Sequence, residues 1–324
     1  MTNFILLIAV AFGVTLTLLL IMLNTPLGKS LLDRPNERSL HEHPVPRIGG
    51  LAIMLGVGSA WLTAKNSQGL ILLAAIAPLV AISLLDDFNG VSPLWRLIVQ
   101  VAVAVLALAA SAQSAWPVAA YASALLMLVW GANLFNFMDG SDGLAGGMAV
   151  FGFSAYALAA ASAGNAEFAV LAGAIAAAAL AFLAFNFFPA RVFMGDAGSV
   201  PLGLLASLLG VTGIQLDLWP IWFPFLVFSP FLVDATVTLI KRGERGEKVW
   251  QAHREHYYQR LILLGHGHRK TALLEYALMI AAGLSALWGA AQPAMTQALL
   301  LGVWALTYLV LVRAIDRRWR DAKQ

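Results

Sequence analysis

Four clusters of polar side chains interrupt an otherwise apolar sequence, and their residue types suit phosphate chemistry. The richest is NLFNFMDGSDGLAGG at 133–147, which directly follows the apolar run YASALLMLVWGA. Carboxylates and amides at the edge of a hydrocarbon segment are costly, so they predict a functional site. The glycines of this stretch allow the close backbone approach that a phosphate requires. The polar side chains of this stretch are Asn133, Asn136, Asp139 and Asp142.

The other three clusters have the same character. They are LLDDFNG with Asp86 and Asp87, FNFFPARVFMGDAGS with Asp196, and QAHREHYYQR with His253 and His256. Aspartates gathered at one face would repel one another if they were left unpaired. Mg²⁺ accepts one or two carboxylates together with substrate phosphates, so the clusters predict a magnesium site and phosphoryl transfer from a soluble diphosphate donor.

Several of these residues also have simpler interpretations. The spacing of His253 and His256 favours a phosphate-contacting or general-acid role, and a zinc pair is disfavoured because no third nitrogen or sulfur ligand stands close in sequence. Asp234 lies inside an apolar segment, which favours function, although a neighbouring polar group could equally well pair with it. Asn136 and Asn186 could instead be helix caps. The remaining histidines are interpreted as solvated loop residues: His41, His43, His266 and His268.

The composition indicates what must position these clusters. Of the 324 residues, 60% are hydrophobic and 11% are charged, and the mean hydropathy is +0.79, which excludes an ordinary soluble globular protein. The absence of cysteine excludes disulfides, thiolate metal sites and cysteine nucleophiles. We therefore expect an all-α polytopic membrane protein that forms one integral domain over residues 1–324.

About eleven membrane-spanning helices are predicted from apolar runs of suitable length. They cover approximately residues 3–23, 48–64, 69–85, 95–113, 117–135, 145–163, 167–185, 200–214, 219–240, 271–290 and 295–313. The segment 200–214 is short and could be tilted or re-entrant. The segment 219–240 contains Pro220, Pro224 and Pro230. These prolines predict either a broken helix that opens a groove to lipid, or a helix that starts at the first two and kinks at the third.

The positions of the basic residues predict the orientation in the membrane. With the N-terminus in the periplasm, all of the 20 Lys and Arg residues except Lys65 fall in cytoplasmic segments. The positive-inside rule therefore predicts a periplasmic N-terminus and a cytoplasmic C-terminus. All four polar clusters then face the cytoplasm, which predicts a single active site there. The expected cytoplasmic loops are 24–47, 86–94, 136–144, 186–199 and 241–270.

These motifs, in this order and spacing, resemble those of the polyprenyl-phosphate N-acetylhexosamine-1-phosphate transferases. RPNERSLHEHPVPRIGG, which includes Arg47, is similar to the first cytoplasmic loop of that family. The resemblance extends from about Asp33 to Lys270. It implies Mg²⁺- or Mn²⁺-dependent transfer of a sugar 1-phosphate from a UDP-sugar to undecaprenyl phosphate at the bacterial inner membrane, with release of UMP.

The resemblance also implies roles for individual residues. Asp86 and Asp87 match the aspartate pair that binds metal and activates the lipid phosphate, and Asp196 matches a metal ligand. His253 and His256 match the catalytic loop that contacts the diphosphate and the sugar. Direct attack by the lipid phosphate is favoured over a covalent aspartyl-phosphate. The substrate-binding residues are then Asn133, Asn136, Asp139, Asp142, Asn186, Phe193 and Arg47.

The histidine loop departs from one branch of this family. The peptidoglycan branch, which transfers phospho-MurNAc-pentapeptide, carries consecutive histidines where this chain has HREHYYQRL. The loop is more similar to enzymes that start O-antigen or related surface glycans with GlcNAc, FucNAc or QuiNAc, and UDP-GlcNAc is favoured. The expected partners are a UDP-sugar, undecaprenyl phosphate and membrane lipid, without nucleic acid and with a homodimer left open.

Two rival hypotheses belong to other classes. A lipid transporter would also have intramembrane acids, but it should place them near the midplane of the membrane. A CDP-alcohol phosphotransferase would carry a D-G-x-x-A-R signature, and the stretch DGSDGL lacks its arginine.

Overall fold

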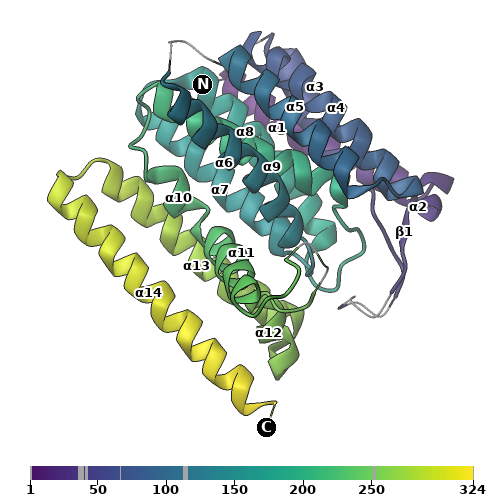
Figure 1. The fold of residues 1–324 in the computed structure, drawn as a ribbon. Helices are drawn as coiled ribbons and strands as arrows, with labels where there is room; N and C mark the ends of the chain where they lie inside the picture. The colour runs from purple at the N-terminus through teal and green to yellow at the C-terminus, as the bar shows by residue number, and fades with distance from the viewer. Residues whose placement is uncertain are drawn as a thin grey trace.

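The protein is a bundle of long helices, described by a computed structural model for residues 2–35, 40, 43–65, 67–111, 116–249, 251 and 253–323 (Figure 1). A short antiparallel ladder pairs β1 (Leu32–Asp33) with β2 (Val45–Pro46). The helical elements are α1 (Thr2–Leu23), α2 (Pro26–Ser30), α3 (Gly49–Ala64), α4 (Ser67–Asn89), α5 (Pro93–Ser111), α6 (Val118–Phe137), α7 (Leu144–Ser162), α8 (Ala166–Asn186), α9 (Asp196–Gln215), α10 (Phe223–Val227), α11 (Ser229–Glu244), α12 (Tyr257–Leu261), the π-helical turn η1 (Ile262–His266), α13 (Gly267–Ala290) and α14 (Ala294–Asp321).

The prediction of an all-α multi-pass membrane protein is confirmed. Within the described residues, nine helices are long and apolar enough to cross a membrane, and α3 is a shorter apolar helix. Each expected span except 219–240 corresponds to one helix, and the short segment 200–214 belongs to the 20-residue helix α9. The assignment of the polar end to the cytoplasm stays a prediction.

Small residues let the helices that carry the site approach α9 closely. A Cβ added to Gly50 in α3 would lie 2.1 Å from the backbone nitrogen of Gly198 in α9. A Cβ added to Gly203 in α9 would lie 2.1 Å from the carbonyl oxygen of Gly131 in α6. Such contacts are typical of packing between membrane helices, where small residues allow backbones to meet. They fix the ends of α3 and α6 beside the beginning of α9.

The expected span 219–240 is broken into α10 and α11 at Phe228. Pro224 lies in the first turn of α10, and Pro230 lies in the first turn of α11. A proline is tolerated there because the first backbone N–H groups of a helix have no partner within the helix. The prediction of a broken helix is therefore confirmed, and each of these two prolines starts a new helix.

Several helices extend into the segments expected to be loops. Asp86 and Asp87 lie in the last turns of α4, and Asp196 is the first residue of α9. A carboxylate is stabilised at the N-terminus of a helix and destabilised at its C-terminus. Asp196 therefore has a favourable position, whereas the pair in α4 requires cations from elsewhere in the fold.

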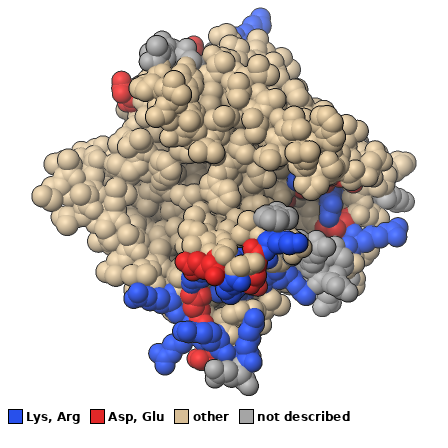
Figure 2. All heavy atoms as spheres, viewed as in Figure 1, with Lys and Arg blue, Asp and Glu red and all other residues tan. Residues whose placement is uncertain are grey.

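Charged side chains gather at one end of the molecule. Figure 2 shows Lys and Arg clustered where α11, α12 and the C-terminal end of α14 meet, with a second group on the side of β1. Helix α14 lies at the edge of the bundle, and within its fully described range none of its residues is buried. The apolar part of α14 is therefore available to contact lipid.

Candidate active site

Arg96 links two of the aspartate clusters. Its Nη1 lies 2.6 Å from Oδ2 of Asp86, and its Nη2 lies 2.6 Å from Oδ2 of Asp196. The other oxygen of Asp86 accepts a hydrogen bond from the backbone N–H of Val91 at 2.6 Å. Arg96 supplies the cation that a carboxylate at the C-terminal end of α4 requires. Arg96 is a site residue that the sequence did not reveal, although it is the first basic residue after the aspartate pair.

Asp87 lies against the beginning of α9. Its Oδ2 accepts a long hydrogen bond of 3.4 Å from the backbone N–H of Ala197, and its Oδ1 is 3.8 Å from Nη1 of Arg47. Gly195 has φ +72°, and a Cβ added there would lie 3.0 Å from Oδ2 of Asp87. Glycine at this position therefore serves both the backbone turn and the close approach of the carboxylate. The other Arg47 Nη bonds Asp33 at 2.6 Å.

Asn136 and Asp139 bring the turn after α6 to the same place. The Asn136 amide donates to Oδ1 of Asp196 at 2.8 Å and to Oγ of Ser199 at 3.1 Å. Burial raises the pKa of the Asp139 carboxyl well above its usual value, and the nearby charge of Asp196 raises it further. No hydrogen bond or ion pair joins the Asp139 side chain to another residue of the described chain. An added cation would therefore stabilise its charged form.

Asp142 and Asn186 hold the loop between α8 and α9 against the start of α7. Asp142 accepts a hydrogen bond from the backbone N–H of Ala190 at 3.0 Å. Asn186 is buried, and its Oδ1 accepts from the N–H of Gly143 at 3.0 Å while its Nδ2 donates to the carbonyl of Val192 at 2.9 Å. Both polar atoms of Asn186 are thus occupied by backbone. Its place in this structure is that of a link between loops.

His268 joins this group, so the expectation that it is a solvated loop residue is wrong. Its Nδ1 lies 3.0 Å from Oγ of Ser141, and its Nε2 is 3.0 Å from the carbonyl oxygen of Leu40. Nδ1 is also 3.8 Å from Oδ1 of Asp142. His43 is exposed, as expected for a solvated residue, whereas His41 lies outside the described residues.

Asp234 organises the histidine loop, and this settles the two interpretations left open for it. It is buried and accepts hydrogen bonds from the backbone N–H groups of Tyr257 at 2.8 Å and Tyr258 at 2.9 Å. Its Oδ1 also lies 3.1 Å from Nδ1 of His256. Asp234 is therefore paired, and its partners are the residue predicted to be catalytic and the first turn of α12.

The histidine loop docks on the turn between α6 and α7. The imidazole of His256 stacks on Phe137 with ring centroids 6.2 Å apart, and the hydroxyl of Tyr258 donates to the carbonyl of Phe137 at 3.3 Å. His253 lies beside His256, with ring centroids 4.7 Å apart. Gly140 allows this contact, because a Cβ there would lie 2.2 Å from the Tyr258 hydroxyl oxygen.

His253 is neutral at neutral pH. Burial, together with the neighbouring His256 and Arg242, lowers its pKa from 6.5 to about 4. A neutral imidazole at neutral pH favours a hydrogen-bonding contact over the general-acid role among the two alternatives for this residue.

The low pKa of His253 predicts how stability depends on pH. An unfolded histidine titrates near 6.5, so between that pH and about 4 the unfolded chain binds the extra proton and stability falls as the pH falls. We expect the melting temperature in detergent to drop between about pH 7 and pH 5, and to drop less in His253→Gln. An equal drop in both proteins would contradict the depressed pKa of His253.

Two of the predicted substrate-binding residues make contacts that join elements of the fold. The Asn133 amide donates to Oε1 of Gln100 at 2.8 Å, which ties α6 to α5. The backbone N–H of Phe193 donates to the carbonyl of Pro46 at 2.8 Å, and its carbonyl accepts from the N–H of Gly49 at 3.0 Å. Phe193 therefore fixes the loop before α9 to the strand β2. Substrate contact by either residue stays a prediction.

The turn 136–143 is the place where all these groups meet. Asn136 bonds Asp196, the carbonyl of Phe137 supports the histidine loop, and the N–H of Gly143 bonds the last residue of α8. Four motifs that are far apart in the sequence thus converge at the ends of helices on one side of the bundle. Such an arrangement can hold a charged, extended ligand between carboxylates, arginines and imidazoles.

The carboxylates fit a divalent cation that is completed by substrate. Within the described residues no group of three acids or histidines lies close enough to enclose a metal ion. Mg²⁺ commonly takes only one or two carboxylates and keeps waters or substrate phosphates as its other ligands. Asp87 lies against Gly195 within electrostatic range of Asp196, and Asp139 adds a buried carboxyl group near Asp196. These residues suit a cation that binds together with a diphosphate.

Comparisons with known proteins agree with this chemistry. A sequence model of glycosyl transferase family 4 matches residues 69–214. A probable undecaprenyl-phosphate N-acetylglucosaminyl 1-phosphate transferase of Bacillus subtilis is 30% identical over 306 residues, covering 86% of this chain and 84% of that protein. An undecaprenyl-phosphate alpha-N-acetylglucosaminyl 1-phosphate transferase of Yersinia pestis is 27% identical, covering 90% and 86%.

A further relative is named for the transfer of a different group. A phospho-N-acetylmuramoyl-pentapeptide-transferase of Geobacillus thermodenitrificans is 30% identical over 291 residues, covering 79% of this chain and 89% of that protein. The matched regions of all three relatives extend over most of this chain. The chain therefore belongs to glycosyl transferase family 4, among the membrane enzymes that transfer an N-acetylhexosamine 1-phosphate to a polyprenyl phosphate.

Proposed function

We propose that the protein transfers N-acetylglucosamine 1-phosphate from UDP-GlcNAc to undecaprenyl phosphate, and so starts O-antigen or a related surface glycan at the bacterial inner membrane. The observation that carries this proposal is the convergence of the four motifs on the turn 136–143. The names of the relatives in Bacillus subtilis and Yersinia pestis support N-acetylglucosamine 1-phosphate as the transferred group and undecaprenyl phosphate as the acceptor.

In the proposed reaction, a phosphate oxygen of undecaprenyl phosphate attacks the phosphorus that carries the sugar. The new phosphoanhydride bond forms as the bond to the uridine-bearing phosphate breaks, and UMP leaves with that electron pair. Asp86 or Asp87 accepts the proton of the lipid phosphate where that group is still protonated. The charged nucleophile and leaving group require nearby cations throughout the displacement.

The chain supplies part of this positive charge. Arg96 and Arg47 already face the aspartates at distances between 2.6 and 3.8 Å, so they can exchange a carboxylate partner for a substrate phosphate. When bound at Asp87 and Asp196, Mg²⁺ or Mn²⁺ would neutralise phosphoryl charge. His253 and His256 stand on the other side of the turn, where they can contact the diphosphate or the sugar.

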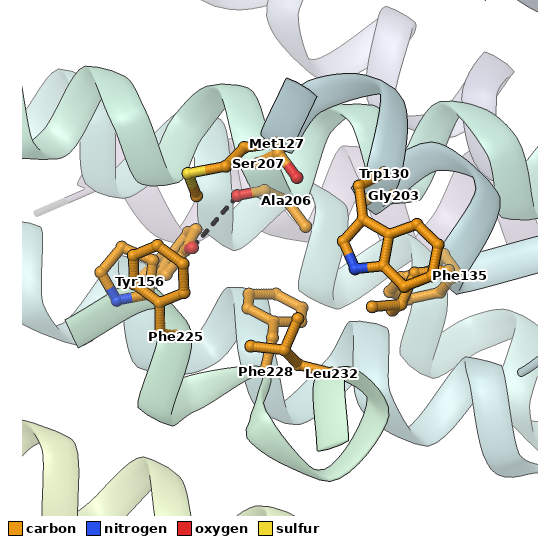
Figure 3. A pocket seen from close by; sticks show the side chains of 13 residues that line it. Met127, Trp130, Phe135, Tyr156, Gly203, Ala206, Ser207, Phe225, Phe228 and Leu232 are labelled. Atoms are coloured by element: carbon orange, nitrogen blue, oxygen red, sulfur yellow. Dashed lines mark hydrogen bonds between the residues drawn. The ribbon is translucent and has the colours of Figure 1, made fainter. Parts of the chain in front are cut away.

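An apolar groove beside the site suits the polyprenyl chain. It lies between α6, α9 and the broken pair α10 and α11, and holds a cavity of about 80 Å³. Figure 3 shows aromatic and aliphatic side chains around it, with the Tyr156 hydroxyl bonded to the Ala206 carbonyl at 3.1 Å. Phe135 lines the groove and directly precedes Asn136. An isoprenoid in the groove would therefore have its phosphate near the aspartates.

Narrowing this groove should weaken binding of the acceptor. We expect Leu232→Trp to raise the KM for undecaprenyl phosphate about tenfold, equivalent to about 1.4 kcal/mol, and to leave the KM for the UDP-sugar unchanged. Steady-state rates of UMP release at varied lipid and varied donor would measure both constants. Leu299→Trp, which changes an exposed residue of α14 outside the groove, is the matched control. An unchanged KM for the lipid, in a variant that melts normally, would remove the groove from acceptor binding.

The assay that tests the function compares donors directly. Purified protein in detergent receives undecaprenyl phosphate, Mg²⁺ and one donor, either UDP-GlcNAc, UDP-FucNAc, UDP-QuiNAc or UDP-MurNAc-pentapeptide, and UMP is quantified. We expect release with UDP-GlcNAc that chelation abolishes. UMP release with another donor only would show that the proposed sugar is wrong and that the proposed reaction class is right. If well-folded protein released no UMP with any of the four donors, the result would count against a transferase and favour a transporter.

The position of the acids favours the enzyme over that alternative. The aspartates lie in terminal turns of helices or in the turn between them, at one end of the bundle. A transporter of lipid-linked substrate would place its binding residues near the middle of the membrane, in discontinuous helices. The broken pair α10 and α11 lines an apolar groove instead.

A further inference from the structure

A second charged region lies apart from the proposed active site. A cleft of about 770 Å³ is formed by the end of α11, by α12 and by the C-terminal part of α14. We call it the basic cleft, because seven Lys or Arg side chains and only three acidic side chains line it. In Figure 2 these blue and red side chains form the charged group at one end of the molecule, on the side where the chain ends in Figure 1.

Acidic residues of the basic cleft already pair with basic residues of α11 and α12. Asp316 accepts hydrogen bonds from Nη1 of Arg260 at 2.8 Å and from the Tyr257 hydroxyl at 3.2 Å, and it also pairs with Lys241. Glu255 lies 2.6 Å from Nη2 of Arg245. These contacts neutralise the cations of α11 and α12 that face the cleft.

The cations on α14 are different. Arg313, Arg317 and Arg320 are exposed, and no hydrogen bond or ion pair joins the side chain of any of them to another residue of the described chain. Their spacing of four and then three residues places them on one face of the helix. Three like charges on one face repel one another, so this face is stabilised by an anion from outside the chain.

The surroundings of these arginines indicate where the anion comes from. Leu306, Val310 and Leu311 on the preceding turns are exposed apolar residues, as expected for a helix surface in lipid. Trp319 lines the cleft, and tryptophan is enriched where membranes meet water. The cleft therefore lies at the level of lipid headgroups, with apolar helix surface leading to it. Basic pockets between helices at that level are suited to acidic headgroups.

We propose that the basic cleft binds the headgroup phosphate of an acidic glycerophospholipid, with Arg313, Arg317 and Arg320 as its main contacts. The acyl chains of this lipid lie along the exposed apolar face of α14. A free phosphate would use the same arginines and gain nothing from that apolar surface. This site is separate from the aspartates and does not depend on the proposed reaction.

The test measures lipid binding rather than activity. Native mass spectrometry of the full-length protein in detergent, titrated with phosphatidylglycerol or with phosphatidylcholine of the same acyl chains, gives both affinities. Each basic residue near an anionic surface contributes about a fivefold change in affinity, so Arg317→Gln with Arg320→Gln should weaken phosphatidylglycerol binding about 25-fold. The matched control is Lys65→Gln with Arg318→Gln, which removes the same charge from exposed positions that do not line the cleft. This control should bind like the wild type.

Three results would overturn the proposal. The first is equal affinity for phosphatidylglycerol in the two double variants, and the second is equal affinity of the wild type for the two lipids. The third is displacement of bound phosphatidylglycerol by inorganic phosphate, which would assign the cleft to a free anion. If the double variant does not fold, the single variants Arg317→Gln and Arg320→Gln, each expected to lose about fivefold, keep the proposal testable.

Discussion

Replacing Asp196 with Asn is expected to lower the rate of UMP release about a thousandfold while the protein still folds. Asp196 holds the Asn136 amide with one carboxylate oxygen and Arg96 with the other. An asparagine can keep the first contact, because its oxygen still accepts, but it loses the charge. Cation-mediated stabilisation of a transferring phosphoryl group is worth several kcal/mol, and about 4 kcal/mol corresponds to a thousandfold in rate.

The measurement is initial UMP release under saturating substrates, together with the melting temperature of each variant. Mn²⁺ binding followed by electron paramagnetic resonance gives a second readout, and it should weaken in Asp196→Asn. Asp217→Asn is the matched control, because Asp217 lies beyond the other end of α9 and its φ of +54° is one that asparagine tolerates. Activity of Asp196→Asn within tenfold of the wild type would exclude Asp196 from the reaction centre.

The membrane helices were predictable because each depends on local sequence. A run of about 20 apolar residues must form a helix to satisfy its backbone in lipid, whatever it packs against. Prolines likewise act locally, and Pro224 and Pro230 mark the starts of α10 and α11. The ends of helices were less predictable. Asp86 and Asp87 were predicted to lie in a loop because they are polar, but α4 continues through them.

The composition of the site was predictable, and its pairings were not. Aspartates next to apolar runs stand out in a sequence because they are costly there. Arg96 does not stand out, because a basic residue near a helix start is ordinary until the structure places it between Asp86 and Asp196. Those two carboxylates belong to different helices, and only the packing of α4 and α5 on α9 brings them together.

The same reason explains the missed role of His268. Its partners are Ser141 and the carbonyl of Leu40, which are 127 and 228 residues away in the sequence. No local pattern distinguishes such a histidine from a solvated one in a polar loop. Asn186 shows the converse case, since its motif suggests a ligand contact while the structure uses both atoms of its amide to join loops.

Replacing Asp234 with Asn should lower kcat about a hundredfold, because catalytic groups misplaced by about 1 Å commonly cost that factor. Asp234 now satisfies the N–H groups of Tyr257 and Tyr258 and faces the His256 ring. An asparagine has one acceptor oxygen, so its amino group must face a donor, and a buried donor left unsatisfied costs about 1–3 kcal/mol. We therefore expect a lower melting temperature as well.

The matched control for this prediction is Thr238→Val, one turn along α11. Thr238 donates to Oδ1 of Asp234 at 3.2 Å, so valine removes this single contact and leaves the three contacts of Asp234 with the histidine loop intact. We expect Thr238→Val to keep kcat within about threefold of the wild type, since one such hydrogen bond contributes only about 1 kcal/mol. If Asp234→Asn lost stability and kept its kcat, Asp234 would support the fold alone. If Asp234→Asn lost kcat while its Mn²⁺ spectra stayed unchanged, metal binding at Asp196 would be intact. The loss would then show that the histidine loop has its own part in catalysis.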